Sequence, residues 1–547
     1  MKKIVKFLKK FWPGTLFSLF ALCFSCWLMW QTFAYHQGTI YIAAKAWSDF
    51  SATLPLIRSF SWGQNFPPGD PLLAGIASSY HFLFYLLVGG LEYLGLRLDF
   101  ALNLPSLLGF TLLMITIFWL AKLLFKNYFV ALLGVILFLF NGSFSFWEFF
   151  KQHPLSWRTP LEIFQNKFFP SFGPYDGKIV SAFWNLNIYT NQRHLALAYG
   201  LLIFFLISLL LPVIKKQKIS HIRIILIGLG VGFFPFLHSV GYFMMMVVLG
   251  MLFLLLQGYR KSFLFVLFMA LAIGAPQLFL IRPGGVEGNL NFHPGYLIAN
   301  QLTLVNFFHY WFWNLGLAFV LIPLGVSKAP SLAKKIFWAF LPLFFIGNLF
   351  QFSQEIAANH KFFNFFIIVG NLFVAYAVFL IWQKGILGKF LATFLIFFLT
   401  FSGIIDFFPI KNDSWMKITD APKNPDIEWI KKNTPPSAFF LNSSYLYHPA
   451  SLAGRKIFLG WPYFPWAGGY DPKQRDNLRK FIYQAPEGYQ GEICQELKNN
   501  HLDFLTTEKN PEEGLLINHR FFEKNFVKIY HNQQTDFRIY DVQQTCL

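Results

Sequence analysis

The chain has 547 residues, of which 55% are hydrophobic, 20% aromatic and 13% charged, and its formal net charge is +19. A soluble domain carries about 25% charged residues, whereas repeated apolar runs of about 18 residues or more are typical of membrane-spanning helices. The basic residues stand in short clusters between the apolar runs, which indicates the positive-inside pattern of a polytopic membrane protein and excludes a nucleic-acid-binding surface.

The N-terminal sequence MKKIVKFLKKFW is basic and leads into a long apolar run with no small-residue cleavage site. We therefore expect an uncleaved anchor whose N-terminus is cytoplasmic, and the later clusters of Lys and Arg are assigned to the same side. The apolar runs predict about eleven membrane-spanning helices. Their expected bounds are 12–34, 105–125, 128–147, 193–212, 222–238, 241–257, 262–281, 307–326, 335–352, 362–383 and 387–408. Because this number is odd, the C-terminal tail is expected outside the cytoplasm.

Segment 72–95, LLAGIASSYHFLFYLLVGGLEYLG, is apolar but contains His81, Glu92 and several Gly. If it crossed the membrane, every later basic cluster would face outward. The sequence therefore predicts that it lies along the outer interface or dips in and returns, buried against protein. A true crossing, with another helix miscounted, is the alternative.

Long loops are expected on the outer face, at 35–104, 148–192 and 282–306, within a membrane domain at 1–410. From Lys411 charged and turn residues become frequent, which predicts a small extracytoplasmic α/β domain at 411–547. This tail has no nucleotide-binding Gly loop, zinc-ligand spacing or Ser nucleophile elbow, so we expect a docking or acceptor-positioning role. Its predicted helices are PDIEWIKKN, QRDNLRKFIYQ and EICQELKNN, and its predicted strands are SAFFLN, LDFLTTE, FVKIYHN and FRIYDV.

Four cysteines are present. Cys23 and Cys26 lie in the first apolar run and are expected to be small core residues. Cys494 and Cys546 lie in the tail, where an extracytoplasmic location would allow a disulfide. Their spacing does not decide between a disulfide and two free thiols.

Asp49 stands at the end of the first outer segment, in AKAWSDF. A carboxylate there can act as a general base on a hydroxyl or ligate a metal, and an ordinary interfacial Asp is the alternative. Arg58 follows in the same loop, and SWGQNFPP adds aromatic residues and a stiff Pro-Pro pair. We expect Asp49 to be catalytic and Arg58 to bind substrate.

Further candidates lie at expected outer ends of spans. Arg193 and His194 begin the helix NQRHLALAYG, and a guanidinium suits phosphate, although interfacial anchoring is the alternative. His360 and Lys361, in QFSQEIAANHKFFNFF, are expected to hold a lipid phosphate or diphosphate, unless Lys361 forms a structural pair with Glu355.

Three other residues are weaker candidates. His238, in FFPFLHSVGYF, is included as a substrate-binding residue, with a buried core histidine as the alternative. Glu162 and Asp176 lie in the second outer loop, where each could serve as a second acid or a metal partner, or simply be solvated.

The order of these features resembles the membrane glycosyltransferases of the GT-C superfamily, such as the dolichyl-phosphate-mannose protein mannosyltransferases and the aminoarabinose transferases. Asp49 is followed by PPGDPLLAG and then by YLGLRLDFALNLPSLLGF, and the detailed match covers roughly 12–142. Mannosyltransferase relatives often carry an adjacent Asp-Glu pair, whereas here Ser48 and Phe50 flank Asp49. That departure leaves the acceptor type and the use of a metal open.

The resemblance implies an all-α, GT-C-like polytopic bundle that moves a sugar from a polyprenyl-phosphate-linked donor to an acceptor hydroxyl at the outer face. The expected mechanism is inverting, with Asp49 as the general base. The expected partners are the lipid-linked donor, the bilayer and a glycan, lipid or protein acceptor, with no nucleic acid. No cofactor is assigned, although a divalent cation is left open. A lipid-linked polysaccharide polymerase or ligase is the alternative, followed by a transporter or flippase.

Overall fold

The computed structural model describes residues 2–171, 179–281, 290–299 and 301–546 and divides into two compact units. Unit 1 comprises Met1–Thr32, Asn103–Leu278 and Asn289–Ser414, and unit 2 comprises Phe33–Leu102, Phe279–Gly288 and Trp415–Leu547. Asp176, one of the predicted loop carboxylates, lies outside the described residues, as does most of the first half of the predicted loop 282–306.

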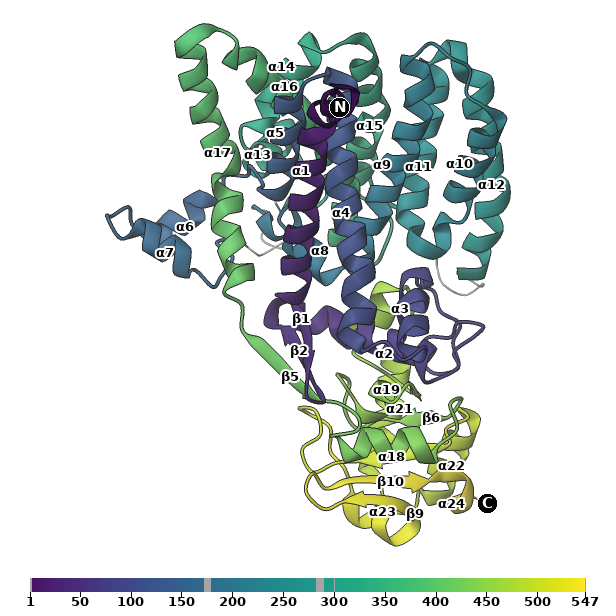
Figure 1. The fold of residues 1–547 in the computed structure, drawn as a ribbon. Coiled ribbons are helices and arrows are strands. Elements are labelled where there is room, and N and C mark those ends of the chain that lie inside the picture. The colour runs from purple at the N-terminus through teal and green to yellow at the C-terminus, as the bar shows by residue number, and fades with distance from the viewer. Residues whose placement is uncertain (1, 172–178, 282–289, 300, 547) are drawn as a thin grey trace. The chain divides into compact units, whose positions relative to one another are not determined.

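Unit 1 is a helical bundle (Figure 1). Within the described residues, eight helices are long and apolar enough to cross a membrane, which makes the chain a multi-pass membrane protein. They are α1 (Lys2–Trp30), α4 (Leu98–Phe125), α9 (Arg193–Ile214), α11 (Phe234–Leu255), α12 (Arg260–Ile281), α15 (Ser331–Leu349), α16 (His360–Trp382) and α17 (Gly385–Lys411).

The remaining predicted spans are shorter or broken. The span predicted at 307–326 consists of α13 (Leu304–Leu315) and α14 (Ala318–Lys328), which meet at 87°. Gly316 lies between them with a φ of +57°, and a Cβ there would overlap the carbonyl oxygen of Gly142. Only glycine fits this position without strain, and its backbone turns the chain.

Two predicted boundaries are wrong in detail. The helix predicted at 128–147 is α5 (Tyr128–Leu139), which ends eight residues early, and α6 (Phe146–Gln152) follows after a break. The break predicted between 238 and 241 falls instead near Phe233, between α10 (His221–Gly232) and α11. The chain continues through 238–241 as a kinked helix.

Helix α16 is the centre of unit 1, since α5, α14, α15 and α17 all pack against it. Close approach depends on small residues, as is common between membrane helices. Gly325 of α14 abuts the carbonyl of Phe373, and Gly134 of α5 leaves room for the side chain of Leu372. Part of the loop predicted at 148–192 also folds, as α7 (Thr159–Gln165) and α8 (Asn187–Asn191).

Unit 2 joins two stretches of chain that the sequence analysis assigned to different domains. Strands β1 (Phe33–His36) and β2 (Thr39–Ala43) form a hairpin, and β5 (Trp415–Thr419) pairs antiparallel with β2 to complete a sheet. Helices α2 (Trp47–Ser61) and α3 (Leu83–Tyr93) follow the hairpin and pack together. The division predicted at residue 410 stays a prediction, as does the location of the tail outside the cytoplasm.

Helix α3 corresponds to the apolar segment 72–95. It has 11 residues, and at 1.5 Å per residue it spans about 17 Å, which is short of the roughly 30 Å of a bilayer core. This length favours the predicted non-crossing segment over a true span.

The C-terminal part of unit 2 is an α/β domain, as predicted, built on a sheet of order β7-β6-β8-β10-β9. Strands β7 (Lys456–Ile457), β6 (Phe439–Leu441) and β8 (Phe504–Thr507) are parallel, and β10 (Phe537–Asp541) and β9 (Val527–Asn532) are antiparallel. Every helix and strand predicted in the tail is present. The helices are α18 (Pro425–Asn433), α19 (Pro449–Leu452), α20 (Tyr463–Ala467), α21 (Lys473–Gln484), α22 (Gln490–Asn499), α23 (His519–Asn525) and α24 (Val542–Thr545).

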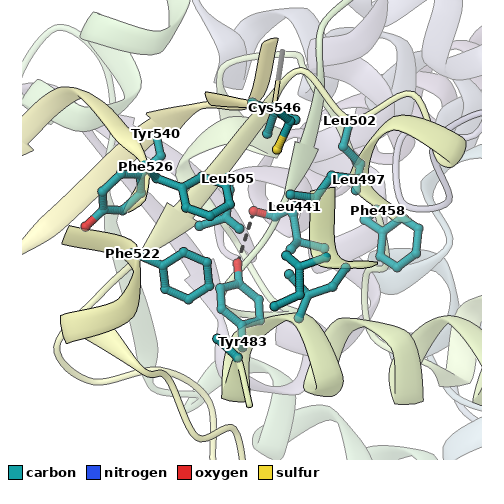
Figure 2. Close-up of a cluster of buried hydrophobic side chains, with 14 of the residues drawn as sticks. Leu441, Phe458, Tyr483, Leu497, Leu502, Leu505, Phe522, Phe526, Tyr540 and Cys546 are labelled. Carbon is teal, nitrogen blue, oxygen red and sulfur yellow. Dashed lines mark hydrogen bonds between the residues drawn. The ribbon is translucent and has the colours of Figure 1, made fainter. Parts of the chain in front are cut away.

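A hydrophobic core fills the space between this sheet and its helices (Figure 2). The hydroxyl of Tyr483 donates to the carbonyls of Leu441 and Thr506, at 3.1 and 2.7 Å, so that its buried oxygen is satisfied. Cys494 and Cys546 form a disulfide beside this core. Of the two possibilities that the sequence left open, the structure therefore has the disulfide and not two free thiols. Cys23 and Cys26 are exposed on α1, so their expected place in the core is wrong.

Candidate active site

Asp49 lies in the first turn of α2, which begins at Trp47 directly after the short helix η1 (Ala44–Ala46) and strand β2. A carboxylate in the first turn is stabilised by the helix dipole. The side chain of Asp49 is half-buried, while Ser48 beside it is exposed. The hairpin and the turn of η1 therefore hold the carboxylate at a fixed place close to the surface of unit 2.

Three tyrosines of unit 2 lie within electrostatic range of Asp49, namely Tyr80, Tyr85 and Tyr447. The Tyr447 ring packs on Trp47 with 4.1 Å between ring centroids, and its hydroxyl donates to the carbonyl of Trp47. The Tyr80 ring stacks on His81 at 3.9 Å. The sequence analysis missed these tyrosines, because no spacing along the chain connects residue 447 with residue 49.

Burial and the nearby charge of Asp49 both raise the pKa of Tyr447 above its ordinary value. Burial likewise raises the pKa of Tyr85. Both phenols therefore stay protonated and uncharged at neutral pH. The arrangement is one carboxylate among neutral hydroxyl groups and aromatic faces, which suits the binding of a hydroxyl-bearing substrate and the removal of its proton.

Arg58 is not placed as a substrate ligand. It is 2% exposed, and its guanidinium lies 2.6 Å from Asp420 Oδ2 and 3.3 Å from Glu92 Oε1. Trp62 lies between two cations, Arg58 and Lys431, each 3.6 Å from a ring centroid. These contacts connect α2 to α3 and to the segment after β5. They support a structural role for Arg58 in place of the predicted substrate contact.

Arg193, in unit 1, is likewise buried, at 1% exposure. Its Nε donates to the carbonyl of Thr190 at 2.7 Å, and its two terminal nitrogens donate to Thr32 Oγ1 at 2.8 Å and Asn103 Oδ1 at 3.3 Å. Further contacts are made with Met29. Because these groups occupy the guanidinium, the structure supports packing by Arg193 and not the predicted phosphate contact.

Four other predicted residues do come together in unit 1. His194 and His238 have ring centroids 5.5 Å apart, and Lys361 lies within electrostatic range of both of them and of His360. We call these four residues the histidine–lysine cluster. The three histidines are buried, and Lys361 is half-buried. The cluster gathers basic groups from α9, α11 and α16, and such groups in a membrane domain suit an anionic ligand.

His238 also shapes its own helix. Its backbone is extended, with φ −166° and ψ 94°, so that the helical ladder of α11 is interrupted there. Its Nδ1 accepts a hydrogen bond of 2.7 Å from the N–H of Gly241, in the manner of an N-cap residue. A Cβ at residue 241 would stand 2.9 Å from Nδ1, so the glycine admits the contact. The kink is therefore a local property of the sequence HSVG.

Asp406 is a buried carboxylate that the sequence analysis passed over. It lies in α17, and its Oδ2 accepts hydrogen bonds from Asn141 Nδ2 at 2.9 Å and Asn185 Nδ2 at 3.3 Å. A carboxylate inside a predicted span was the available signal, since such groups are costly and usually have a role. Here it fixes two loop segments of unit 1 to α17.

Next to Asn141 lies a cavity of about 40 Å³, which leaves room for about one or two water molecules. Its polar lining consists mainly of amides, and aromatic and aliphatic side chains complete the lining. The lining includes Asn141, Asn314, Asn364, Asn371, Trp184 and Tyr189.

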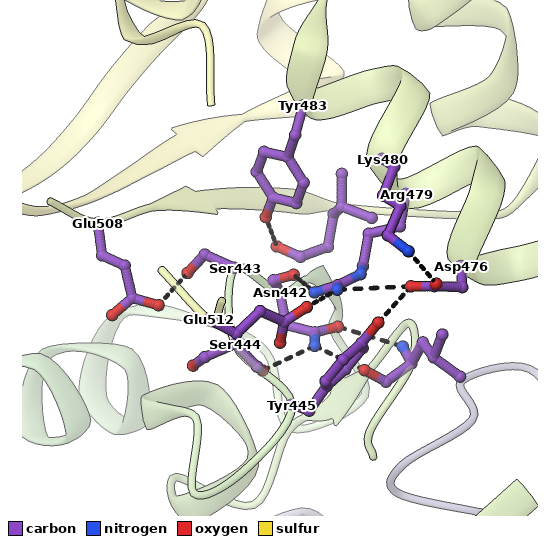
Figure 3. Close-up of polar contacts among 12 residues, drawn as sticks. Asn442, Ser443, Ser444, Tyr445, Asp476, Arg479, Lys480, Tyr483, Glu508 and Glu512 are labelled. Atoms are coloured by element: carbon purple, nitrogen blue, oxygen red, sulfur yellow. Dashed lines mark hydrogen bonds and ion pairs between the residues drawn. The ribbon is translucent and has the colours of Figure 1, made fainter. Parts of the chain in front are cut away.

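The α/β domain holds a further polar cluster where its parallel strands end (Figure 3). The guanidinium of Arg479 contacts Glu512 and donates to the carbonyl of Asn442 at 3.1 Å. Asp476 accepts from Tyr445 and, at 2.6 Å, from Lys480. Burial alone would raise the pKa of Asp476, but these two hydrogen bonds and the charge of Arg479 lower it below its ordinary value.

No known family profile matches the chain, and no curated protein is similar to it in sequence. Among solved structures, the chain is similar to the archaeal oligosaccharyltransferase AglB from Archaeoglobus fulgidus, in complex with an inhibitory peptide and a dolichol-phosphate. The identity is 11% and the TM-score 0.46, and the match covers 98% of this chain and 75% of that chain. The assignments below rest on the residues of this chain.

Proposed function

We propose that the chain is a membrane glycosyltransferase that moves a sugar from a polyprenyl-phosphate-linked donor to an acceptor hydroxyl, at the extracytoplasmic face. The observation that carries the proposal is the setting of Asp49 in unit 2, at the start of α2 and among three tyrosines. The positive-inside pattern of the sequence supports a cytoplasmic N-terminus and an outer location of the tail.

Asp49 is assigned as the general base. It takes the proton of the acceptor hydroxyl as the oxygen attacks the anomeric carbon, and the bond from that carbon to the phosphate oxygen breaks with its electron pair leaving on the phosphate. A single displacement of this kind inverts the anomeric configuration. The hydroxyl of Tyr447 donates to the carbonyl of Trp47, so this residue supports the start of α2 and leaves the removal of the proton to Asp49.

The histidine–lysine cluster is assigned to the donor phosphate. A lysine ammonium group within this cluster suits an anionic phosphate. The imidazole rings of the three histidines add ring N–H groups that can donate hydrogen bonds to phosphate oxygens. Arg58 and Arg193 have no place in this assignment, because their guanidinium groups are held by protein atoms.

The test uses the full chain in lipid nanodiscs with a labelled polyprenyl-phosphate sugar. We expect wild-type protein to release polyprenyl phosphate and form a glycosylated acceptor, and Asp49→Asn to lower the rate by at least about a hundredfold with donor binding retained. Glu428→Gln is the matched control, because this carboxylate pairs only on the surface with Lys432. Retained turnover in Asp49→Asn would remove Asp49 from the role of base.

Two additional arms separate the alternatives. Release of polyprenyl diphosphate, in place of the monophosphate, would indicate a polymerase or ligase. Solute uptake into vesicles without any release of lipid phosphate would indicate a transporter. Loss of transfer on addition of EDTA, with recovery on Mg²⁺ or Mn²⁺, would add a divalent cation to the function of Asp49.

A further inference from the structure

Residues 461–470, WPYFPWAGGY, form an aromatic segment on unit 2 that the proposed mechanism leaves unused. Helix α20 lies inside it, and five of its ten residues are aromatic. Trp461 and Tyr463 stack with their ring centroids 5.1 Å apart, and Tyr463 and Trp466 are 5.8 Å apart. Trp466 is 39% exposed, and the other rings of the segment are half-buried. The segment therefore presents several aromatic rings side by side at the surface.

The segment is held firmly by hydrogen bonds at both ends. Just before the segment, the side-chain amide of Asn442 forms two hydrogen bonds with the backbone of Leu459. It donates to the Leu459 carbonyl at 2.7 Å and accepts from the Leu459 N–H at 3.1 Å. Within the segment, the N–H of Tyr470 donates to the carbonyl of Pro465 at 2.9 Å. A backbone fixed in this way limits the movement of the rings that it carries, which favours a preformed binding surface.

The segment lies where ligands of α/β sheets are expected. It follows strand β7, and the parallel strands β7, β6 and β8 bring their carboxyl ends to the same edge of the sheet. The loop after β6 supplies Ser443, whose hydroxyl donates to Glu508 after β8 at 2.8 Å (Figure 3). Hydroxyl and carboxylate groups thus occupy the same edge of the sheet as the aromatic rings.

The segment also adjoins the surroundings of Asp49. An added Cβ at Gly468 would stand 3.3 Å from Ser79 Oγ, and the side chains of Ser79 and Tyr470 interact. Ser79 directly precedes Tyr80, one of the three tyrosines within range of Asp49. Within unit 2, the aromatic segment is therefore continuous with the residues around the assigned base.

The charge of the segment restricts the class of ligand. Between Lys456 and Lys473 the sequence has no Lys or Arg, and its single charged residue is Asp471. The neighbouring Arg475 donates to the carbonyls of Ala74 and Phe458. A phosphate is usually bound by several cations, so a neutral ligand fits this segment better. The C–H faces of a pyranose carry a partial positive charge, which complements the negative face of an aromatic ring.

We propose that the aromatic segment 461–470 binds a pyranose ring of a neutral saccharide acceptor, so that the acceptor of the transferred sugar is itself a glycan. The proposal rests on the proposed function, since it names the acceptor that Asp49 would deprotonate.

The first test measures binding, with the full chain in nanodiscs and no donor present. Maltotriose, cellotriose and mannotriose serve as probes in saturation-transfer difference NMR. We expect at least one to bind, and Trp466→Ala to weaken its affinity about three- to tenfold, the size of one aromatic contact. Trp157→Ala is the control, because Trp157 is an 85% exposed tryptophan of unit 1.

The second test measures transfer to the saccharide that binds. We expect Trp466→Ala to raise the KM for that acceptor about three- to tenfold while kcat changes less than twofold, and Trp157→Ala to leave both constants unchanged. A fall in kcat at constant KM would overturn the proposal, because it would indicate disturbed chemistry and not a lost stacking surface.

The third test separates a saccharide from the bilayer as the occupant. A nitroxide is placed on Trp466→Cys in a chain that carries Cys23→Ser and Cys26→Ser. We expect relaxation of the label by a water-soluble nickel complex and its protection by the saccharide. Relaxation by oxygen alone, with no effect of any saccharide, would overturn the inference in favour of membrane contact. Failure of the wild type to release lipid phosphate would overturn the proposed function, which the binding test does not depend on.

Discussion

Two arginines, one in each unit, are buried to the same degree and satisfied in opposite ways. Arg58 in unit 2 faces the carboxylates of Asp420 and Glu92, whereas Arg193 in unit 1 donates to neutral oxygens, among them Thr32 Oγ1. The sequence analysis predicted that both bind substrate, Arg193 through a phosphate. The comparison teaches that a buried guanidinium near an expected active site can serve to stabilise the fold. The partners of the guanidinium determine how much stability is lost when it is removed.

The partners differ because the surroundings differ. Unit 2 contains charged residues that can be brought together from distant parts of the chain, so a charge can be met by opposite charges. In a membrane bundle carboxylates are scarce, and a cation is satisfied by carbonyl, hydroxyl and amide oxygens at the ends of helices. Removing the cation leaves two buried charges behind in the first case and neutral acceptors in the second.

The largest expected effect is that of Arg58→Ala. It leaves Asp420 and Glu92 buried without their cation, and we expect the opening free energy of unit 2 to fall by about 3–5 kcal/mol. Hydrogen exchange of amides in α2 and β5 measures this. Lys432→Ala, which breaks an exposed pair with Glu428, is the control and should cost at most about 1 kcal/mol.

A triple variant tests the reason given for that loss. Arg58→Met combined with Glu92→Gln and Asp420→Asn removes all three charges together, and much of the lost stability should return. If the triple variant were as unstable as Arg58→Ala, packing of the guanidinium on Trp62 would be the dominant contribution and not the uncompensated charge.

Arg193→Met is expected to have a smaller effect. The substitution leaves only neutral hydrogen-bond acceptors without their donor. The loss of the charge-assisted hydrogen bonds should lower the unfolding free energy of unit 1 by about 1.5–3 kcal/mol. Hydrogen exchange at the start of α9 measures it. An Arg193→Lys variant that stayed stable but bound the donor lipid much more weakly would contradict the comparison. It would support the predicted contact between Arg193 and a phosphate.

The smallest effect concerns His448 in the α/β domain, a basic side chain that is buried without a charge. Burial, together with the nearby charge of Arg479, lowers its pKa to about 3, from about 6.5 in an unfolded chain. The unfolded state therefore binds the proton first as the pH falls, and stability declines between pH 6.5 and 3. Moving from pH 7.5 to 5.5 should cost roughly 1.4 kcal/mol.

His448→Asn isolates this contribution. Asparagine preserves an acceptor at the N-cap of α19, where His448 Nδ1 accepts from the N–H of Ala450 at 3.2 Å. The variant should be less stable at pH 7.5 because the contact with Thr506 is lost, but its stability should fall less between pH 7.5 and 5.5. An unchanged pH dependence in hydrogen exchange of β6 and β8 would assign the acid sensitivity to another group.

Much of the fold was predictable, because periodicity and apolar length act locally. The helices and strands of the tail and most membrane helices follow from such patterns. The breaks did not follow from them. The bend at Gly316 depends on its contact with Gly142, and the kink at His238 on a side chain that caps its own helix.

The candidate site was predictable in part. Asp49 was singled out from its place after the first span, although its position in the first turn of a helix was not predicted. The histidines and Lys361 were singled out as basic groups at the expected ends of spans. The neighbours of Asp49 were not foreseen. Tyr447 reaches Trp47 only through the folding of unit 2, and no property of a single segment encodes that contact.

Strand β5 has a consequence for how the protein is made. It emerges from the ribosome after all the predicted membrane spans, yet it supplies the last strand of the sheet begun by β1 and β2. Until then the outer edge of β2 presents open backbone groups, the kind of edge that chaperones and proteases detect. A stalled or truncated polypeptide therefore carries an incomplete support for Asp49, and quality control can distinguish it from the finished protein.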